Sequence, residues 1–493
     1  MNKRRWLRVL PLAALLITSG ITTAGAASSG TRAAQASTSM FARDDVYCTP
    51  SRPLPGRKAS SPGVGVNAIT ITDMSIDSAG LARLGISQPE YEKFFTVFAN
   101  EINKCGGING RKINLKKAVY NPAAPDLAGH IQALCLKATE DHKAFVVVGV
   151  GTPQGTALQR CISVSHKTMY NGPVNMPSVD YADAKGRLFS VNSAADKSAA
   201  AVISDMIGQS VFRGRKVGII GSATSPTAAA EQRVQYEDYL EKKNIDVESF
   251  EILPCQGNVC VQGIGPAIRR MKDKGVNLMI MTAYVSVTTV GSIFREMANQ
   301  NLRAPVYGPH TGSLHADSVQ QTLVRTTGND GARFVSNNGF YAFNTLDVQG
   351  AWRTGQAGPS KIALTCNSIV AKALKQNLYE FGERDINTSR WTGPPSACVQ
   401  LREIARAIES LGANVTTERM VAAIKTQKAI DDTYTYRGVP EFSARKWYSD
   451  RSVTPTKGVM LKFNFPCPLP TVQSANACFL PVDRPARVRT IKY

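Results

Sequence analysis

The stretch that decides the fold lies at residues 98–113 and reads FANEINKCGGINGRKI. Aromatic residues upstream recur at helical spacing and predict a helix over Gln88–Lys104 with one apolar face. The pair Gly106-Gly107 ends this helix, because glycine readily adopts the left-handed conformation that follows a last helical turn. A strand is expected next, over Ile113–Tyr120. A helix that turns directly into a strand is typical of α/β proteins.

The alternation of strand and helix signals continues along the chain. Phe145-Val146-Val147-Val148 is the continuous apolar run expected of a parallel strand buried on both faces. Strand–helix–strand units build parallel sheets that helices cover. Two such runs follow one another, so the sequence predicts an α/β fold with two doubly wound lobes.

The N-terminus predicts export. Residues 1–26 combine a basic start, a short apolar stretch and the small-x-small sequence Ala24-Gly25-Ala26, which together are typical of a secretory signal peptide. Residues 27–62 are rich in Ser, Ala and Pro and predict a flexible leader. The first cysteine is Cys48, well beyond the apolar stretch, so no lipid anchor is evident. We expect a secreted protein that works outside the cytoplasm, in the cell envelope.

The ten cysteines predict disulfides, because an exported chain meets oxidising conditions. Near neighbours suggest two local pairs, Cys255–Cys260 and Cys467–Cys478. Three further pairs are expected on weaker grounds: Cys105–Cys135, Cys366–Cys398 and, by remainder, Cys48–Cys161. Ten cysteines permit on the order of 945 pairings, so only the local pairs are specified. We expect no metal site and no cofactor, because His and Cys do not cluster along the chain.

Charge and motifs exclude several function classes. The formal net charge is +21, and a basic exported protein is attracted to anionic cell-envelope polymers. No nucleic-acid-binding signature is present, so nucleic acid is not an expected partner. The sequence also lacks the Gly-x-Ser-x-Gly elbow, the His-Glu-x-x-His motif and the P-loop. We therefore expect no enzyme, and a secreted hydrolase stays a remote alternative.

Residues 98–113 resemble the A-x-E-I-N-x-x-G-G-I-N-G-R-K-I segment of type I periplasmic solute-binding proteins. This family includes the leucine/isoleucine/valine-binding proteins of ABC importers. Tyr120-Asn121-Pro122 falls where the family has a strand-end Y-D-D, and Val148–Gln154 falls at its G-x-x-S-S ligand loop. The resemblance covers about residues 64–465.

The resemblance implies two Rossmann-like lobes joined by three hinge crossovers. The first lobe would comprise 64–190 plus 339–430, and the second 191–338 plus 431–493. The lobes would capture a small polar ligand, either amino-acid-like or a small carboxylate or amide, and an ABC permease would receive it from a monomeric chain. A secreted ligand sensor or envelope scavenger without a permease is the alternative on the same fold.

The resemblance also implies a set of ligand-binding candidates: Thr152, Gln154, Asn171, Ser193, Asp196, Tyr284 and His310. Backbone N–H groups and a hydroxyl in the loop that contains Thr152 would suit a carboxylate. Each candidate also has an ordinary interpretation. Thr152 could sit in a simple strand–helix turn, Asp196 could offset a helix dipole, and Tyr284 could only pack.

His310 departs from the family pattern. At the matching position, amino-acid binders carry a carboxylate that pairs with the ammonium group of the ligand. A neutral imidazole supplies no such counter-charge. Either Asp196 or another acid takes this role, or the ligand is not an α-amino acid. The segments 351–360 and 383–395 look like insertions for which the sequence suggests no role.

Overall fold

The computed structural model describes twenty segments of the chain between Tyr47 and Thr490. These are residues 47–48, 50–83, 90–152, 156–172, 176–190, 194–223, 225–255, 260, 262–285, 287–309, 317–344, 357–359, 361–375, 388–426, 434–436, 445–447, 453–455, 457–468, 476–483 and 489–490. The expected signal peptide and most of the 351–360 segment lie outside them.

A five-stranded parallel sheet forms the centre of the first lobe, with strand order β2-β1-β3-β4-β5. Its strands are β1 (Ala68–Asp73), β2 (Lys112–Lys117), β3 (Val146–Val148), β4 (Met169–Asn171) and β5 (Leu188–Phe189). The central strand β3 is fully buried, as its unbroken valine run predicts.

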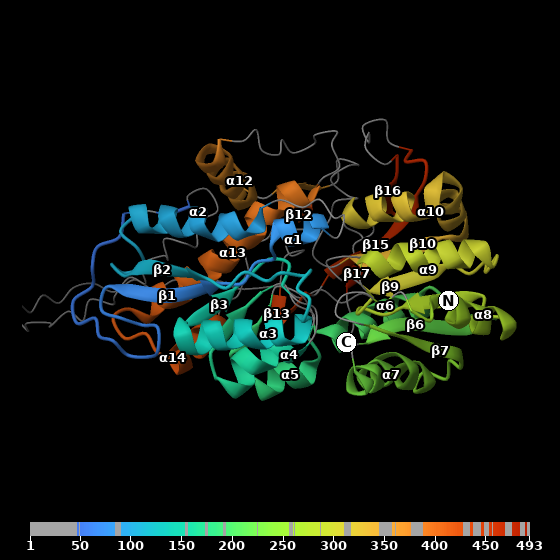
Figure 1. Ribbon diagram of the computed structural model, residues 1–493, viewed down its shortest axis with the longest axis horizontal. Helices are drawn as coiled ribbons and strands as arrows, with labels where there is room; N and C mark the ends of the chain where they lie inside the picture. The colour runs from blue at the N-terminus through green and yellow to red at the C-terminus, as the bar shows by residue number, and fades with distance from the viewer. Residues whose placement is uncertain are drawn as a thin grey trace, which may run out of the picture. The chain divides into compact units, whose positions relative to one another are not determined.

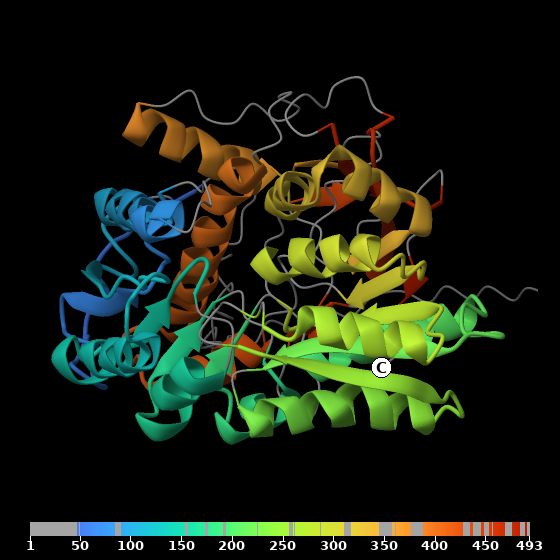
Figure 2. The same cartoon turned by 45° about the vertical axis from the view of Figure 1, so that its right-hand side comes forward.

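Helices cover both faces of this sheet (Figure 1). One face carries α2 (Tyr91–Lys104), α12 (Lys361–Leu374), α13 (Thr388–Leu411) and α14 (Thr417–Thr426). The other face carries α3 (Leu127–Leu136), η1 (Lys137–Asp141), α4 (Thr156–Arg160), η2 (Cys161–Ser165) and α5 (Ser178–Asp183). The short helix α1 (Ser78–Arg83) follows β1. Figure 2 shows the orange helix α13 beside the blue and green strands, although it comes late in the chain.

Two glycines end α2 as the sequence predicts. Gly106 and Gly107 have φ values of +90° and +77°. A Cβ on Gly107 would lie 2.2 Å from the carbonyl oxygen of Arg111, so only glycine fits this turn. The Gly-Gly pair therefore positions β2 directly beside β1.

A second, mostly parallel sheet has strand order β16-β15-β10-β9-β8-β6-β7, with β17 paired to β15. The parallel strands are β6 (Val217–Ala223), β7 (Val247–Pro254), β8 (Leu278–Met281), β9 (Val306–Pro309) and β10 (Phe340–Asn344). β15 (Lys457–Asn464), β16 (Cys478–Pro481) and β17 (Arg489–Thr490) add an antiparallel edge.

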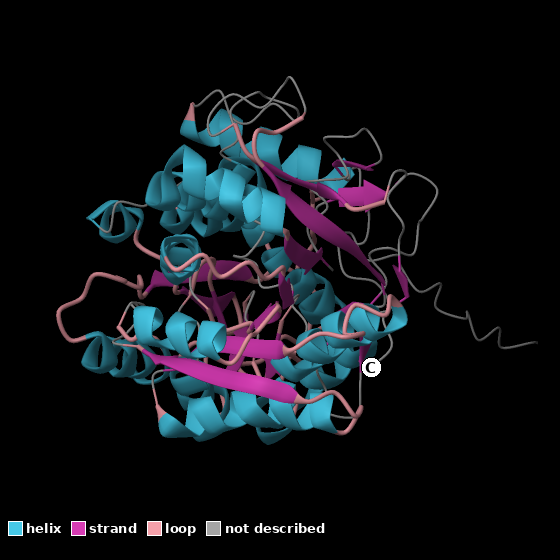
Figure 3. Ribbon diagram, turned by 90° about the vertical axis from the view of Figure 1, so that its right-hand side faces the viewer, coloured by secondary structure: helices cyan, strands magenta, loops and turns pink. Residues whose placement is uncertain are grey.

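Helices also flank the second sheet, in cyan around the magenta strands of Figure 3. α8 (Ile264–Asp273), α9 (Val287–Asn299) and α10 (Asp317–Asn338, interrupted at Gly328) share one core with the sheet. α6 (Ala195–Gly208) and α7 (Pro226–Glu241) share another. Two small antiparallel pairs join β11 (Ala357–Pro359) to β12 (Tyr434–Tyr436) and β13 (Arg445–Trp447) to β14 (Val453–Pro455).

The chain passes between the two sheets three times, after β5, after β10 and after α14. One expected boundary is wrong. The sequence placed residues from 339 onward in the first lobe, but Phe340–Asn344 pairs with both β9 and β15 in the second sheet. The second crossover therefore comes after Asn344. The apolar strand β10 packs into the core of the second lobe, and the chain returns to the first lobe only after it.

The expectation of a flexible leader up to residue 62 is wrong for the described part of that segment. Tyr47 is 6 % exposed, and its backbone carbonyl accepts a hydrogen bond from Arg402 at 3.0 Å. Ser51 donates its N–H to the carbonyl oxygen of Cys105 at 2.7 Å. Ser60 donates to the carbonyl oxygen of Val415. Residues 47–48 and 50–62 therefore lie along the first lobe, and we call them the strap.

Two of the expected disulfides are also wrong. The structure joins Cys48 to Cys105 and Cys135 to Cys161, where the sequence suggested Cys105–Cys135 and Cys48–Cys161. The strap brings Cys48 to the end of α2, so Cys105 is its nearest partner. The remaining pairs are Cys255–Cys260, Cys366–Cys398 and Cys467–Cys478.

Among the described helices, none is both long enough and apolar enough to cross a membrane.

Candidate functional site

Buried polar side chains gather at the carboxyl ends of the strands in both lobes. In the first lobe they are Asp73, Ser75, Thr152, Asn171 and Ser190, and in the second Ser222 and Thr282, all at most 3 % exposed. The central strands β3 and β8 carry only apolar side chains. Open α/β sheets bind ligands beyond the carboxyl ends of their strands. Buried hydroxyl and amide groups at these ends therefore mark the candidate site.

The loop that follows β3, residues 149–152, is fixed by hydrogen bonds to Gln400, Ser75 and Ile76. Gln400 of α13 bonds both backbone groups of Gly149, with Nε2 to the carbonyl oxygen at 3.2 Å and Oε1 to the N–H at 3.3 Å. The Val150 N–H donates to Ser75 Oγ at 3.1 Å, and the Ile76 N–H donates to the Val150 carbonyl oxygen at 2.9 Å. This loop is therefore preorganised by residues far from it in the sequence.

Thr152 completes the described part of the loop. Its Oγ1 accepts a hydrogen bond of 2.8 Å from the hydroxyl of Tyr170 on β4. Burial raises the pKa of Tyr170 to about 12, so the phenol stays protonated and donates. Because the Thr152 oxygen is the acceptor in this bond, its own hydroxyl hydrogen is left to donate elsewhere. Thr152 can thus offer a hydrogen bond to an oxygen atom of a ligand.

Asn171 lies at the end of β4 and is fully buried. Its Nδ2 lies 3.4 Å from the carbonyl oxygen of Gln400 and 3.4 Å from Glu403 Oε2. Within the described residues its Oδ1 has no hydrogen-bond partner. Asn171 therefore contacts α13 through its amide nitrogen and keeps one unused acceptor inside the lobe.

Asp196 sits in the first turn of α6, just after the first crossover. Its carboxylate accepts hydrogen bonds from the N–H of Ser178 at 2.8 Å and from its hydroxyl at 2.6 Å. Asp196 thus ties α6 to the start of α5 across the crossover. Both carboxylate oxygens take part in this tie, one with the N–H and the other with the hydroxyl of Ser178.

Tyr284 follows β8 in the second lobe and is partly exposed. Its backbone oxygen accepts a 2.6 Å hydrogen bond from Ser222 Oγ, and its hydroxyl lies 3.2 Å from Gln235 Nε2. Burial of the hydroxyl raises the pKa of Tyr284 well above its usual value. Next to it, Thr282 Oγ1 donates to Gln232 Oε1 at 2.7 Å. The ends of β6 and β8 are therefore cross-linked through α7.

The solved structures with a similar fold include three binding proteins. A leucine-, isoleucine-, valine-, threonine- and alanine-binding protein from Brucella ovis is 13 % identical over 86 % of this chain and 95 % of its own, with a TM-score of 0.58. A fatty acid ABC transporter substrate-binding protein from Thermomonospora curvata is 14 % identical over 87 % and 95 %, also at 0.58. A type 1 periplasmic binding protein from Bordetella pertussis is 15 % identical over 86 % and 99 %, at 0.54.

The chain has the type I periplasmic binding protein fold. The similarity is one of fold, since sequence identity is low throughout. No protein-family model matches the sequence. No curated protein matches it either.

Three candidates in this type I binding fold, Gln154, Ser193 and His310, lie outside the described residues. Of the others, the structure brings Thr152 and Asn171 to neighbouring strand ends of the first sheet. Asp196 and Tyr284 belong to the second lobe.

Sequence reasoning missed five residues that hold the candidate site together: Asp73, Ser75, Gln232, Gln235 and Gln400. Asp73 carries the one local signal among them, as a charged residue that ends an otherwise uncharged strand. Gln400 gives no local signal, because only the fold brings it to Gly149.

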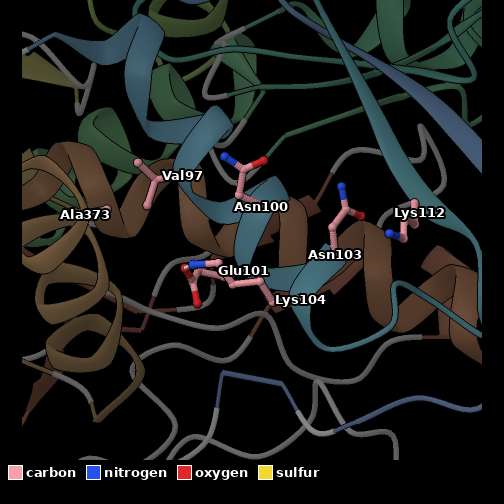
Figure 4. Close-up of a pocket in the computed structure, with 7 residues that line it drawn as sticks. All are labelled: Val97, Asn100, Glu101, Asn103, Lys104, Lys112 and Ala373. Carbon is pink, nitrogen blue, oxygen red and sulfur yellow. Dashed lines mark hydrogen bonds and ion pairs between the residues drawn. The ribbon is translucent and has the colours of Figure 1, made fainter.

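A pocket of about 490 Å³ lies elsewhere, along α2 (Figure 4). It is lined by Val97, Asn100, Glu101, Asn103, Lys104, Lys112 and Ala373. Lys112 begins β2, so the pocket is at the amino end of the sheet. Asn103 uses its amide on the backbone of Ile113, and Lys104 pairs with Glu101 at 2.6 Å. This pocket is not the ligand site that a type I binding fold would use.

Among the residues that the structure describes, one group brings metal-ligating atoms close together, namely Cys135, Cys161 and His166. The two sulfur atoms are joined to each other in a disulfide. They are therefore not thiolates that could bind a metal ion.

Proposed function

We propose that this protein captures a small polar solute between its two lobes, outside the cytoplasm, and delivers it to the permease of an ABC importer. One observation carries the proposal. Buried hydroxyl, amide and carboxyl groups stand at the carboxyl ends of the strands in both lobes, where an α/β sheet binds ligands. The binding proteins with the same fold support it.

The first lobe would anchor the ligand through the loop 149–152. Thr152 would donate its hydroxyl hydrogen to an oxygen atom of the ligand, while Tyr170 keeps the Thr152 side chain in place. A carboxylate or an amide carbonyl fits such a donor. Asp196 is engaged with Ser178, which favours a small carboxylate or amide over a ligand that needs a counter-charge for its ammonium group. Gln154, Ser193 and His310 stay proposed contacts.

The second lobe would close on the ligand through Tyr284 and the side chains beside it. A ligand that contacts both lobes stabilises the closed arrangement relative to an open one. Closure, rather than any chemical step, would then be the signal that the permease reads. No catalysis is part of this function.

We also propose that the chain is exported. Residues 1–26 would direct the chain out of the cytoplasm, and five disulfides are consistent with an oxidising compartment. We propose that the exported chain works as a monomer in the cell envelope, where its positive charge would favour contact with anionic polymers.

The proposal is tested by thermal unfolding of the protein as an expression host secretes it, against a panel of amino acids, aliphatic and aromatic carboxylates, and amides. A ligand at 100 times its dissociation constant adds about 2.7 kcal/mol to the free energy of unfolding. For a chain of this size that is a rise in Tm of roughly 2–4 °C or less. We expect one chemical class to raise the Tm.

Thr152→Val removes the hydroxyl and keeps the shape of the side chain. We expect it to weaken binding of the identified ligand about tenfold or more. The matched control is Thr426→Val, which removes an exposed hydroxyl at the end of α14 in the same lobe. Equal ligand affinity in both variants would remove Thr152 from the site. A panel without any shift would contradict solute capture.

A further inference from the structure

A buried carboxyl group lies directly beneath the loop 149–152. Asp73 is the last residue of β1, and its side chain is fully buried. Its Oδ1 accepts hydrogen bonds from the N–H of Ser75 at 2.8 Å and from its hydroxyl at 2.6 Å. Its Oδ2 is buried and has no hydrogen-bond partner among the described residues. One oxygen of this carboxyl group is thus buried without a hydrogen-bond partner among these residues.

Ser75 connects this carboxyl group to the loop. The Ser75 hydroxyl donates to Asp73 and accepts from the N–H of Val150 at 3.1 Å. The Met74 N–H donates to the carbonyl oxygen of Val148 at 2.8 Å, directly before the loop. Two hydrogen bonds in series, from Ser75 to Asp73 and from Val150 to Ser75, therefore connect the Asp73 carboxyl group to the backbone of the loop.

The charged groups around Asp73 do not neutralise it. Lys117 lies opposite in the register of β2, but its Nζ donates to the backbone oxygen of Glu92 at 2.7 Å. Glu92 of α2 adds a second negative group, which accepts a hydrogen bond from Ser78. On the far side, beyond Val148 of β3, α13 contributes another acid, Glu403, next to Asn171. Asp73 makes no ion pair with any described residue.

We propose that Asp73 is a positioning residue of the loop 149–152. The proton on its carboxyl group keeps the loop in its closed conformation, and we call this a proton lock. With its carboxyl group protonated, the end of β1 and the loop stay closed. With the group ionised, local opening of this segment becomes more favourable and the loop binds its ligand less tightly. The proposal rests on the proposed function only where it treats this loop as the ligand loop.

The sign of the effect follows from burial. An ionised carboxylate without a counter-charge is unfavourable in a dry site, and here burial raises the pKa of Asp73 to about 7. Local opening would return the carboxyl group to water, where its pKa is about 3.9. Between these two values the closed segment binds a proton that the open segment releases. Opening therefore becomes more favourable as the pH rises toward 7, and it levels off above that.

Hydrogen exchange followed by mass spectrometry tests the lock on the full secreted protein without any ligand. After correction for the intrinsic pH dependence of exchange, we expect protection of the peptide covering 146–152 to fall. The fall should be at least about tenfold between about pH 5 and about pH 7, with a plateau above. In Asp73→Asn the same peptide should show no pH step. Asp246→Asn, which changes an exposed acid in the second lobe, should behave as the natural protein does.

A second variant keeps the test decisive if Asp73→Asn does not fold. Ser75→Ala leaves the carboxyl group and removes the relay to Val150. Here the peptide covering 68–74 should keep its pH step, while the loop peptide loses protection at every pH. A pH-independent loop in the natural protein would overturn the proposal, and so would an unchanged step in Asp73→Asn. Failure of the ligand screen leaves these exchange results unaffected.

Discussion

Gln400 holds Gly149 by both backbone groups, although 251 residues separate them in the sequence. The two bonds, at 3.3 and 3.2 Å, join a helix that begins after the second crossover to the loop that leaves β3. A Cβ on Gly149 would also lie 2.5 Å from Thr152 Cγ2, so only glycine fits here. The conformation of the candidate ligand loop is therefore set by a distant part of the chain.

Replacing Gln400 by Ala should cost stability and binding together. Both backbone groups of Gly149 would lose their partner in a buried site, at about 1–3 kcal/mol for an unsatisfied group. Urea unfolding measures the loss. Gln209→Ala, which removes an exposed glutamine paired with Asp205, should change the free energy of unfolding by less than about 0.5 kcal/mol. Equal stability of the two variants would show that Gln400 does not hold the loop.

The hydroxyl of Tyr170 should matter for binding more than for stability. Tyr170→Phe keeps the ring and removes the donor to Thr152, which should cost about 1 kcal/mol of stability. The freed Thr152 side chain can then rotate, and we expect ligand affinity to fall roughly 3- to 10-fold. Titration of the ligand found by the thermal screen measures this. Tyr239→Phe, which removes a hydroxyl near Ser204 in the second lobe, is the control and should bind normally.

The global stability should depend on pH through Asp73. Its pKa is raised to about 7 in the folded protein, above the unfolded value, so the folded state holds the proton more tightly. Stability from this group is present at low pH and is lost as the pH rises from about 4 to about 7. The full shift corresponds to an upper estimate on the order of 4 kcal/mol. Denaturant unfolding at several pH values should show this decline, and Asp73→Asn should flatten it. A decline of the same size in both proteins would assign it to other groups.

The disulfides should differ in what they contribute. Cys48–Cys105 closes 57 residues and fixes the strap, while Cys255–Cys260 closes five. Loop-closure entropy predicts a loss of about 4 kcal/mol for the first and about 2 kcal/mol for the second when each pair is changed to Ser. Calorimetric or denaturant unfolding of the two double variants measures both. A smaller loss for Cys48–Cys105 would mean that the strap stays ordered through its hydrogen bonds alone.

Local signals predicted much of the fold. The glycine pair after α2 and the valine run of β3 each act on their own neighbours in the chain, so reading the sequence locally was enough. The sequence did not predict α10. Asp317–Asn338 is rich in Thr, Asn and Gly, which are weak helix formers, and Gly328 interrupts the helix. Tertiary packing stabilises that helix against α9.

Fewer residues of the candidate site than of the fold could be predicted from the sequence. Thr152 and Asn171 are candidates because a resemblance marked their segments. Gln400 and the partner of Cys48 could not be found, because both depend on contacts between segments that only the folded chain brings together. The burial of Asp73 has the same origin, since α2 and the neighbouring strands together exclude water from it.

The central claim is that one small solute binds between the lobes at the strand ends. Native mass spectrometry of the secreted protein, mixed with a library of small carboxylates, amides and amino acids, tests it most directly. The account predicts a single adduct of one ligand per chain, which Thr152→Val weakens and Thr426→Val does not. A folded protein that carries no adduct from such a library, or one whose adduct survives equally in both variants, would contradict the account.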